Sequence, residues 1–161
     1  MDEEASSRFE DFFEREYPKL LRVLWLASGD RTEAEDLAQE AMARTFERWS
    51  SVKGKASPAG YVYKTAFNLN RSRLRRLRVR ARRLVLESDQ DEIAAAETRS
   101  DVREALRSLP TGQRDALILV GWLGLDSNEA GEILGIEAES VRSRVHRARS
   151  ALRGLLGGYS G

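Results

Sequence analysis

The sequence predicts an all-α protein made of two small helical domains, and three observations support this class. Almost every segment of the 161 residues places apolar side chains at steps of three and four, the spacing of one helix face. No segment of any length shows the alternation of apolar and polar residues that is typical of a strand. Glycine, proline and polar clusters divide the helical pattern into pieces of ordinary helix length.

The first helix is predicted from apolar positions between Phe9 and Leu24, and Pro18 is expected to kink or restart it. The Ser28-Gly29-Asp30 sequence is a turn signal and is expected to end this helix.

The second helix is expected to open with a capping box, in which Thr32 and Glu35 satisfy backbone amides of the first turn. The helix should reach about Trp49. Its predicted inward-facing residues are Leu37, Ala41 and Phe46.

A polar loop is predicted at residues 50–56, which include Lys53 and Lys55. Ser57 and Pro58 then favour a helix start, because serine is a good N-cap and proline suits the first helical position. The long helix that follows has a predicted buried stripe of Tyr63, Phe67, Asn70, Leu74, Leu77, Ala81 and Leu84.

This long helix contains the most basic segment of the chain. Residues 71–83 hold eight arginines and no acid, although the net charge of the whole chain is only +1. Such a segment favours phosphate binding, but a basic run alone is weak evidence of sequence specificity. Tyr63 and Phe67 are interpreted as core residues. For Tyr61, both stacking on a nucleic-acid base and packing in the core are left open.

An acidic segment follows, with six acids and one arginine in residues 84–101. It predicts a flexible linker at residues 87–101 between one domain at residues 1–86 and a second at residues 102–161. Helical pattern is expected to resume within Ile93 to Leu109, before Pro110.

The last third predicts three helices, at residues 112–120, 127–134 and 138–153, with the spacing of a helix-turn-helix. Gly131 is small where two helices should touch, and Gly135 suits a left-handed turn. The third helix carries five arginines against one acid, which predicts that it enters the major groove of DNA; the alternative is a solvated charged face. His146 is expected to contact DNA rather than a metal, because it has no partner ligands.

Catalysis has few candidates in this composition. The chain has no cysteine and a single histidine, so we expect no disulfide, no thiolate zinc site, no metal or other cofactor and no catalytic residue. Asp36, Gln39 and Glu40 form either an ordinary wet helix face or, as the functional interpretation, a protein interface. No apolar run is long enough to span a membrane, so a cytoplasmic protein without membrane insertion is expected.

Four segments in this order resemble the extracytoplasmic-function sigma factors, bacterial proteins in which region 2 and region 4 are joined by a linker. Residues 35–41 (Glu-Asp-Leu-Ala-Gln-Glu-Ala) and 57–69 are similar to region 2. Residues 105–114 and 141–149 are similar to the two ends of region 4. The resemblance implies a sigma factor that binds core RNA polymerase, through its β′ and β subunits, and promoter DNA, under control of an anti-sigma factor.

The resemblance also implies roles for particular residues. Asp36, Gln39 and Glu40 would contact the β′ coiled coil of core polymerase. The residues implied for the minus-10 element, where a base is flipped out, are Lys53, Lys55, Tyr61, Asn68, Arg71 and Arg75. Those implied for the minus-35 element are Arg142, Ser143, Arg144, His146 and Arg147.

Two departures from the family pattern concern region 4. Val120-Gly121 stands where many relatives have a basic residue that touches phosphate, and Glu139-Ser140 replaces the usual Gly-Thr. We therefore expect reduced affinity for the minus-35 element, and the promoter specificity of relatives does not carry over to this sequence. The alternative functions are a stand-alone helix-turn-helix regulator that ignores core polymerase and an arginine-rich RNA-binding protein; an enzyme is disfavoured.

Overall fold

The computed structural model of the chain describes residues 2–84 and 101–156, and every regular element in these two ranges is a helix. The all-α prediction is confirmed. The N-terminal helices are α1 (Glu3–Ser28), α2 (Arg31–Glu47), α3 (Trp49–Val52) and α4 (Pro58–Leu84). The C-terminal helices are α5 (Asp101–Ser108), α6 (Thr111–Leu117), the π-helix η2 (Ile118–Trp122), α7 (Ser127–Leu134) and α8 (Ala138–Leu156).

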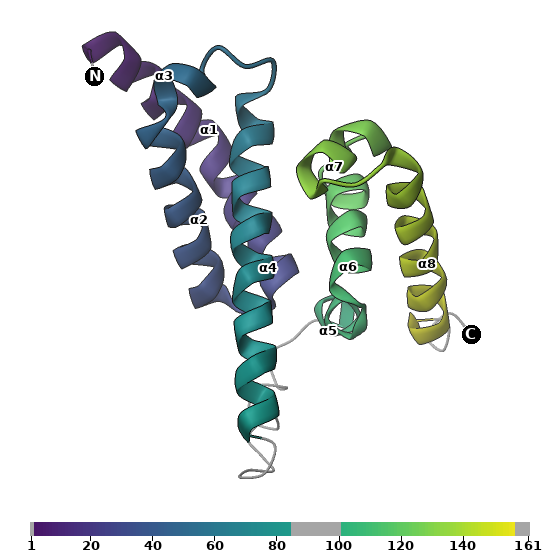
Figure 1. Ribbon diagram of the computed structural model, residues 1–161. Coiled ribbons are helices and arrows are strands. Elements are labelled where there is room, and N and C mark those ends of the chain that lie inside the picture. The colour runs from purple at the N-terminus through teal and green to yellow at the C-terminus, as the bar shows by residue number, and fades with distance from the viewer. Residues whose placement is uncertain (1, 85–100, 157–161) are drawn as a thin grey trace.

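The N-terminal helices form a bundle in which α1, α2 and α4 lie side by side (Figure 1). Its core includes Leu20 and Leu24 of α1 and Phe67 of α4, none of which is exposed. Pro18 is an exposed residue inside α1 and does not interrupt the helix. Gly29 ends α1 in the left-handed conformation, with φ of 74°, as the turn signal predicted.

The cap of α2 differs from the prediction. Asp30, not Thr32, is the N-cap, and its carboxylate accepts a hydrogen bond from the backbone N–H of Glu33 at 3.1 Å. Thr32 lies within the first turn, so the capping box expected with Glu35 was wrong. Asp30 wins because a carboxylate is a strong N-cap and is placed directly after the left-handed Gly29.

The segment between α2 and α4 is partly helical rather than a continuous loop. Trp49 and Val52 of α3 are buried, whereas Lys53 and Lys55 are exposed. Phe46, predicted to face inward, is 40% exposed, because it lies at the end of α2 against the half-buried ring of Phe9. Its inward assignment was wrong.

α4 begins as predicted and then leaves the core. The Ser57 hydroxyl accepts a hydrogen bond from the backbone N–H of Gly60 at 3.0 Å, and Pro58 occupies the first helical position. Three residues of the predicted stripe are buried, namely Tyr63, Phe67 and Asn70. Leu74 is half-buried, Leu77 is 43% exposed and Ala81 is exposed, so the second half of the predicted stripe was wrong. The side chain of Leu84 lies outside the described residues.

The C-terminal helices pack beside α4 (Figure 1). Arg114 of α6 is buried and holds four backbone carbonyls. It donates to those of Leu106 at 2.9 Å, Leu109 at 3.0 Å and Arg107 at 3.3 Å, all near the end of α5. The fourth acceptor is the carbonyl of Ala27 in α1, at 2.8 Å. Arg114 therefore links the C-terminal helices to the end of α1.

The N-terminal and C-terminal helices share one cluster of buried apolar side chains, which includes Leu24 of α1, Ile133 of α7 and Val145 of α8. The expectation of two small domains is met by two groups of helices that pack against each other. The expected linker at residues 87–101, the domain boundary within it and the helical pattern from Ile93 lie outside the described residues, except that α5 begins at Asp101. No helix in the described ranges is long and apolar enough to cross a membrane.

Candidate nucleic-acid interface

The helix-turn-helix consists of α7, the turn that begins at Gly135, and α8. The carboxylate of Asp126 accepts from the Glu129 backbone N–H at 2.8 Å, and the Glu129 carboxylate accepts from the Asp126 backbone N–H at 3.1 Å. Gly135 has a φ of 70°, and a Cβ on Gly131 would lie 2.6 Å from the carbonyl oxygen of Ile136. The two glycines thus permit the sharp turn and the close approach that orient α8.

α8 has one buried face and one basic exposed face. Val141, Val145 and Ala148 are buried and hold the helix against the C-terminal core. The opposite face exposes Arg142, Ser143, His146, Arg147 and Arg149. Four of the five residues predicted for the minus-35 element therefore lie together on the outer surface of α8.

The fifth predicted residue, Arg144, is half-buried and turned away from that face. A Cβ on Gly112 would lie 2.7 Å from its Nη1 atom, so the guanidinium lies across the start of α6. In this position Arg144 lines a cleft between the C-terminal helices and α4.

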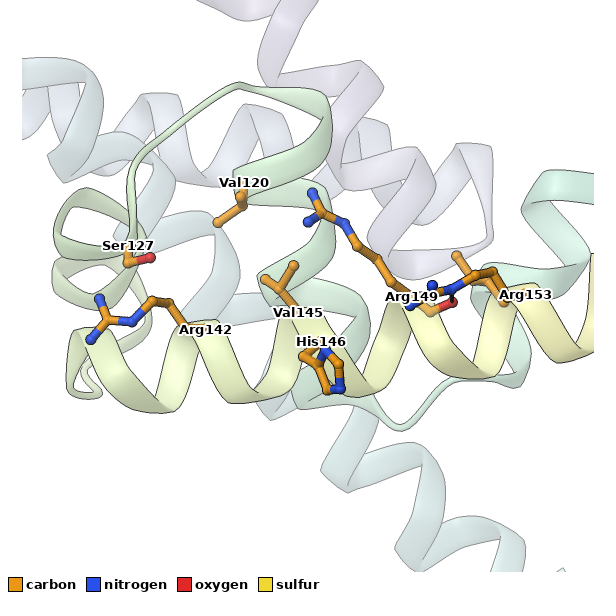
Figure 2. A pocket seen from close by; sticks show the side chains of 8 residues that line it. Val120, Ser127, Arg142, Val145, His146, Arg149 and Arg153 are labelled. Carbon is orange, nitrogen blue, oxygen red and sulfur yellow. Dashed lines mark hydrogen bonds between the residues drawn. The ribbon is translucent and has the colours of Figure 1, made fainter.

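A groove of about 860 Å³ runs along α8. Figure 2 shows Arg142, His146, Arg149 and Arg153 projecting from α8, with Val120 and Ser127 on neighbouring segments. The apolar lining consists of Val120, Val145 and Leu152. The groove therefore combines an apolar floor with a basic rim.

The arginines of α4 have two different surroundings. Arg73 donates to the carbonyl of Ser28 at 3.2 Å and lies 3.9 Å from Glu33, so it ties α4 to α1 and α2. Arg71 contacts the side chain of Asn68 and donates to the carbonyl of Leu134 at 3.3 Å. From Arg75 onward the arginines of α4 are exposed.

The residues predicted for the minus-10 element lie along the exposed side of α4 and in the loop before it. Lys53, Lys55 and Asn68 are exposed, and Tyr61 is half-buried with the Lys55 ammonium 5.9 Å from its ring centroid. Tyr61 and Asn68 share a polar groove of about 450 Å³ with residues that the sequence analysis missed. These are Arg44, Glu47, Arg48, Thr65, Leu69 and Ser72.

Arg44 lies in the last turn of α2, and Arg48, four positions later, is the residue that caps the end of this helix. In the helix predicted to reach about Trp49, a spacing of four would place both side chains on one face. That spacing was the available signal. The sequence analysis assigned phosphate contacts to the arginine-rich segment of α4, and it passed over these two residues because they stand in a segment whose net charge is negative.

Asp36, Gln39 and Glu40 are exposed on α2, which fits both an ordinary wet helix face and a protein interface. Glu40 pairs with Arg44 at 2.8 Å, and this pair lies on the surface. The face is therefore accessible to a partner.

Comparison with known families assigns the two halves of the chain. A family model described as sigma-70 region 2 matches residues 12–80, and one described as sigma-70, region 4 matches residues 99–152. The chain is 30% identical to the RNA polymerase sigma-E factor of Streptomyces coelicolor, covering 90% of this chain and 84% of that protein. It is 34% identical to the ECF sigma factor EcfG of Rhodopseudomonas palustris, covering 86% and 80%.

The chain belongs to the extracytoplasmic-function sigma factors. It also matches SigE of Mycolicibacterium smegmatis at 30% identity over 99% of its length, but spans only 65% of that relative, which is less than two thirds. Two solved structures share the fold of this sigma factor. The sigma factor RpoE crystallised with the anti-sigma factor NepR, from Bartonella quintana, matches with a TM-score of 0.77 and 24% identity, covering 93% of this chain and 97% of that one. CnrH in complex with the cytosolic domain of CnrY matches with a TM-score of 0.70 and 21% identity, covering 96% and 91%.

The residue ranges of the two family matches correspond to the two groups of helices in this sigma factor. Region 2 covers α2, α3 and most of α1 and α4, whereas region 4 covers α5 to α7 and most of α8. Val120, one of the departures from the family pattern, lines the groove along α8. Glu139 and Ser140, the other departure, are exposed at the start of α8.

One acid of this sigma factor is buried among arginines. Asp115 of α6 is 1% exposed, and its Oδ1 atom has no hydrogen-bond partner. Burial raises the pKa of Asp115 to about 7, against the opposing charges of Arg114, Arg71 and Arg144. Its position carried no sequence signal, because an acid beside Arg114 looks like an ordinary surface pair.

Proposed function

We propose that this chain directs transcription initiation by binding core RNA polymerase and recognising two promoter elements. The observation that carries the proposal is that one sigma-family chain has two arginine-bearing helices, α4 and α8, and that most of their arginines are exposed. Polymerase performs the chemistry, so the chain itself is proposed to be a DNA-binding factor and not an enzyme. A cytoplasmic location follows from this proposal, because bacterial transcription takes place there.

We propose that α8 recognises the minus-35 element in the major groove. Arg142, His146 and Arg147 are exposed on its outer face. An arginine there can bond guanine O6 and N7 bidentately, while neighbouring arginines hold phosphates. The capped α7 and the turn at Gly135 fix the angle at which this face is presented.

The minus-10 element is proposed to bind along α4 and the loop before it. The groove beside Tyr61 and Asn68 is lined by polar groups, by Arg44 of α2 and by Arg48 at its C-cap. Arginine can hold the phosphates of a displaced strand, and a tyrosine ring can stack on an unpaired base. Arg44 and Arg48 therefore join Lys53, Lys55 and the α4 arginines as proposed DNA contacts.

The exposed face of Asp36, Gln39 and Glu40 is proposed to bind the β′ subunit, with further contacts to β. An anti-sigma factor is a proposed regulator, since two structures with this fold contain sigma factors bound to anti-sigma factors. The N-terminal residues to about 86 and the C-terminal residues from about 102 are proposed to act as separate domains in the promoter complex.

The distance between the two promoter elements requires that the N-terminal and C-terminal domains move apart. The two elements lie about 25 base pairs apart, roughly 85 Å of straight duplex at about 3.4 Å per base pair. Here Asn68, Arg71 and Arg75 line one cleft together with Arg144. The two sets of DNA contacts cannot occupy both elements from this arrangement, so we propose that the closed form opens on core polymerase.

The decisive experiment is run-off transcription with purified core polymerase on a library of promoter fragments. Added chain is expected to concentrate initiation at defined start points. The double variant Asp36→Ala/Glu40→Ala should lose binding in a core-polymerase pull-down, whereas Glu10→Ala/Asp11→Ala, which removes two exposed acids from α1, should not. An unchanged distribution of start points would contradict the proposal, and promoter binding without core binding would support a stand-alone regulator.

A further inference from the structure

A cleft of about 620 Å³ separates α4 from the C-terminal helices, and four arginines from both sides line it. α4 contributes Arg71, Arg75 and Arg78, and α8 contributes Arg144. The other lining residues are Asn68, Ser72, Leu74, Thr111 and Gly112. The cleft therefore has hydrogen-bonding groups and four positive charges, and no acid lines it.

The charge of these arginines is not balanced by ion pairs. No carboxylate oxygen of the described residues lies within 4.0 Å of a nitrogen of any of the four. By contrast, Arg8, Arg31 and Arg44 each pair with a glutamate four residues away. Like charges that converge across a boundary repel each other, so an anion in the cleft would favour this arrangement.

The guanidinium groups are held in place by neutral contacts. Arg71 donates to the carbonyl of Leu134 at 3.3 Å, and Arg78 donates to the hydroxyl of Thr111 at 2.9 Å. Arg144 lies across Gly112, where the missing side chain leaves room for it. A guanidinium has five N–H donors, so these contacts leave most donors available for another acceptor.

The buried acid Asp115 does not neutralise the arginines of the cleft. The charges of Arg71 and Arg144 both act on Asp115, but burial raises its pKa to about 7, so this carboxyl group is only partly ionised at neutral pH. Asp115 does not line the cleft. The cleft thus keeps its positive charge in the described arrangement.

We propose that this cleft binds a compact anion with several linked phosphate groups, such as an oligophosphate or the triphosphate of a nucleotide. Its volume lies within the range of small-molecule sites, and arginine binds phosphate bidentately. The bound anion would bridge α4 and α8 and stabilise the closed arrangement. If the proposed function holds, it would also compete with promoter DNA for Arg71, Arg75 and Arg144.

The first test titrates sodium tripolyphosphate into the full chain at fixed ionic strength, without polymerase or DNA, using calorimetry. One saturable site per chain is expected. Arg78→Ala and Arg144→Ala should each weaken binding at least tenfold, whereas Arg83→Ala on α4 and Arg149→Ala on α8 should change it less than twofold, because neither lines the cleft. Equal losses in all four variants, or several anions per chain, would overturn the proposal in favour of general charge attraction.

Gly112→Ala provides a test that leaves the charge unchanged. A methyl group there would occupy the space within 2.7 Å of Arg144 Nη1, and the flexible guanidinium must move away. Binding of tripolyphosphate should weaken about fivefold with normal thermal stability. Unchanged affinity would contradict the role given to Arg144, and Gly54→Ala, at a position with open space, is the matched control.

The bridging action is tested by the distance between the two groups of helices. The chain has no native cysteine, so Ala43→Cys on α2 and Ser150→Cys on α8, both exposed, can carry a fluorophore pair. Tripolyphosphate should raise energy transfer, and the Arg78→Ala variant should not respond. Binding without any change in transfer would overturn the bridging claim.

Parallel titrations with ATP, GTP and adenosine identify the source of the phosphates. Equal affinity for tripolyphosphate and both nucleotides means that the phosphate chain alone is recognised, and tighter nucleotide binding means that a nucleoside is recognised too. Adenosine binding as tightly as ATP would contradict the proposal. Because polymerase is absent, these tests can fail while run-off transcription succeeds, which keeps the two proposals distinguishable.

Discussion

α4 and α8 both carry closely spaced arginines, but they present them in different ways. α8 keeps a continuous buried face of Val141, Val145 and Ala148, so its exposed arginines project from one side. The first half of α4 has a buried face that ends at Asn70, whereas every side chain from Arg75 to Arg83 is exposed. The same residue type therefore forms a directed surface on α8 and an all-round basic rod on the second half of α4.

Helix length relative to α2, together with an offset from α1, explains this difference, because α1 has 26 residues but ends before α4 does (Figure 1). α4 has 27 residues and α2 has 17, which correspond to about 40 Å and about 25 Å at about 1.5 Å per residue. The second half of α4 extends past its partner helices (Figure 1). A directed surface suits readout of base edges, whereas an all-round rod suits contacts to phosphates on more than one side.

The largest expected effect separates the two halves of α4. Phe67→Ala should lower the free energy of unfolding by about 3–5 kcal/mol, because it empties a fully buried site. Leu77→Ala should cost less than about 1 kcal/mol, because Leu77 is 43% exposed. Urea denaturation measures both, and similar losses would mean that the end of α4 is also part of the core.

The sequence predicted best those features that depend on neighbouring residues. The bounds of α7, the start of α4 at Pro58 and the turn at Gly135 were all predicted correctly, because each depends on a local cap or glycine. The exposed face of α8 followed from helical periodicity.

The errors concern features that depend on distant parts of the chain. Periodicity continued through Leu77 and Ala81, but burial needs a partner helix that reaches that far. The inward turn of Arg144 depends on Gly112, which is 32 positions away in the sequence. The burial of Asp115 depends on packing between helices, which no local pattern encodes.

The ionisation of Asp115 reports on the contact between the two basic helices, because the charges of Arg71 of α4 and Arg144 of α8 both act on it. Burial raises the pKa of Asp115 to about 7, from an ordinary value of 3.8. The folded state therefore holds a proton that the unfolded state releases, and stability should fall as pH rises from about 4 to about 7. Asp115→Asn should remove this dependence and raise the free energy of unfolding at pH 8 by up to about 4 kcal/mol.

Urea denaturation at pH 5, 6.5 and 8 provides the measurement. Asp11→Asn, at an exposed position on α1, is the control and should follow the wild type at each pH. A constant difference between Asp115→Asn and wild type would show that Asp115 stays ionised in the fold. In that case the arginines of α4 and α8 dominate its surroundings.

The orientation of α8 depends on the close approach at Gly131. Gly131→Ala places a Cβ 2.6 Å from the backbone carbonyl of Ile136, and a backbone atom cannot move as easily as a side-chain end. The expected cost is about 1–3 kcal/mol in unfolding free energy, with weaker binding to duplex DNA. Gly154→Ala, in open space within α8, should instead stabilise the helix by up to about 1 kcal/mol. A stabilised Gly131→Ala variant would refute the tight-turn explanation.

The smallest expected effects distinguish the directed surface from the rod. Arg147→Ala on α8 should weaken binding to the preferred minus-35 sequence by about 1–3 kcal/mol and reduce discrimination, if its guanidinium reads a base edge. Arg144→Ala should do the same only if Arg144 leaves the cleft on opening.

Arg80→Ala on α4 should weaken binding to all sequences alike and lower the slope of the salt dependence by about 1, because Arg80 contributes one phosphate contact. Competition binding at several salt concentrations measures both quantities, and a uniform loss for Arg147→Ala would assign that arginine to phosphate and remove the functional difference between the two helices.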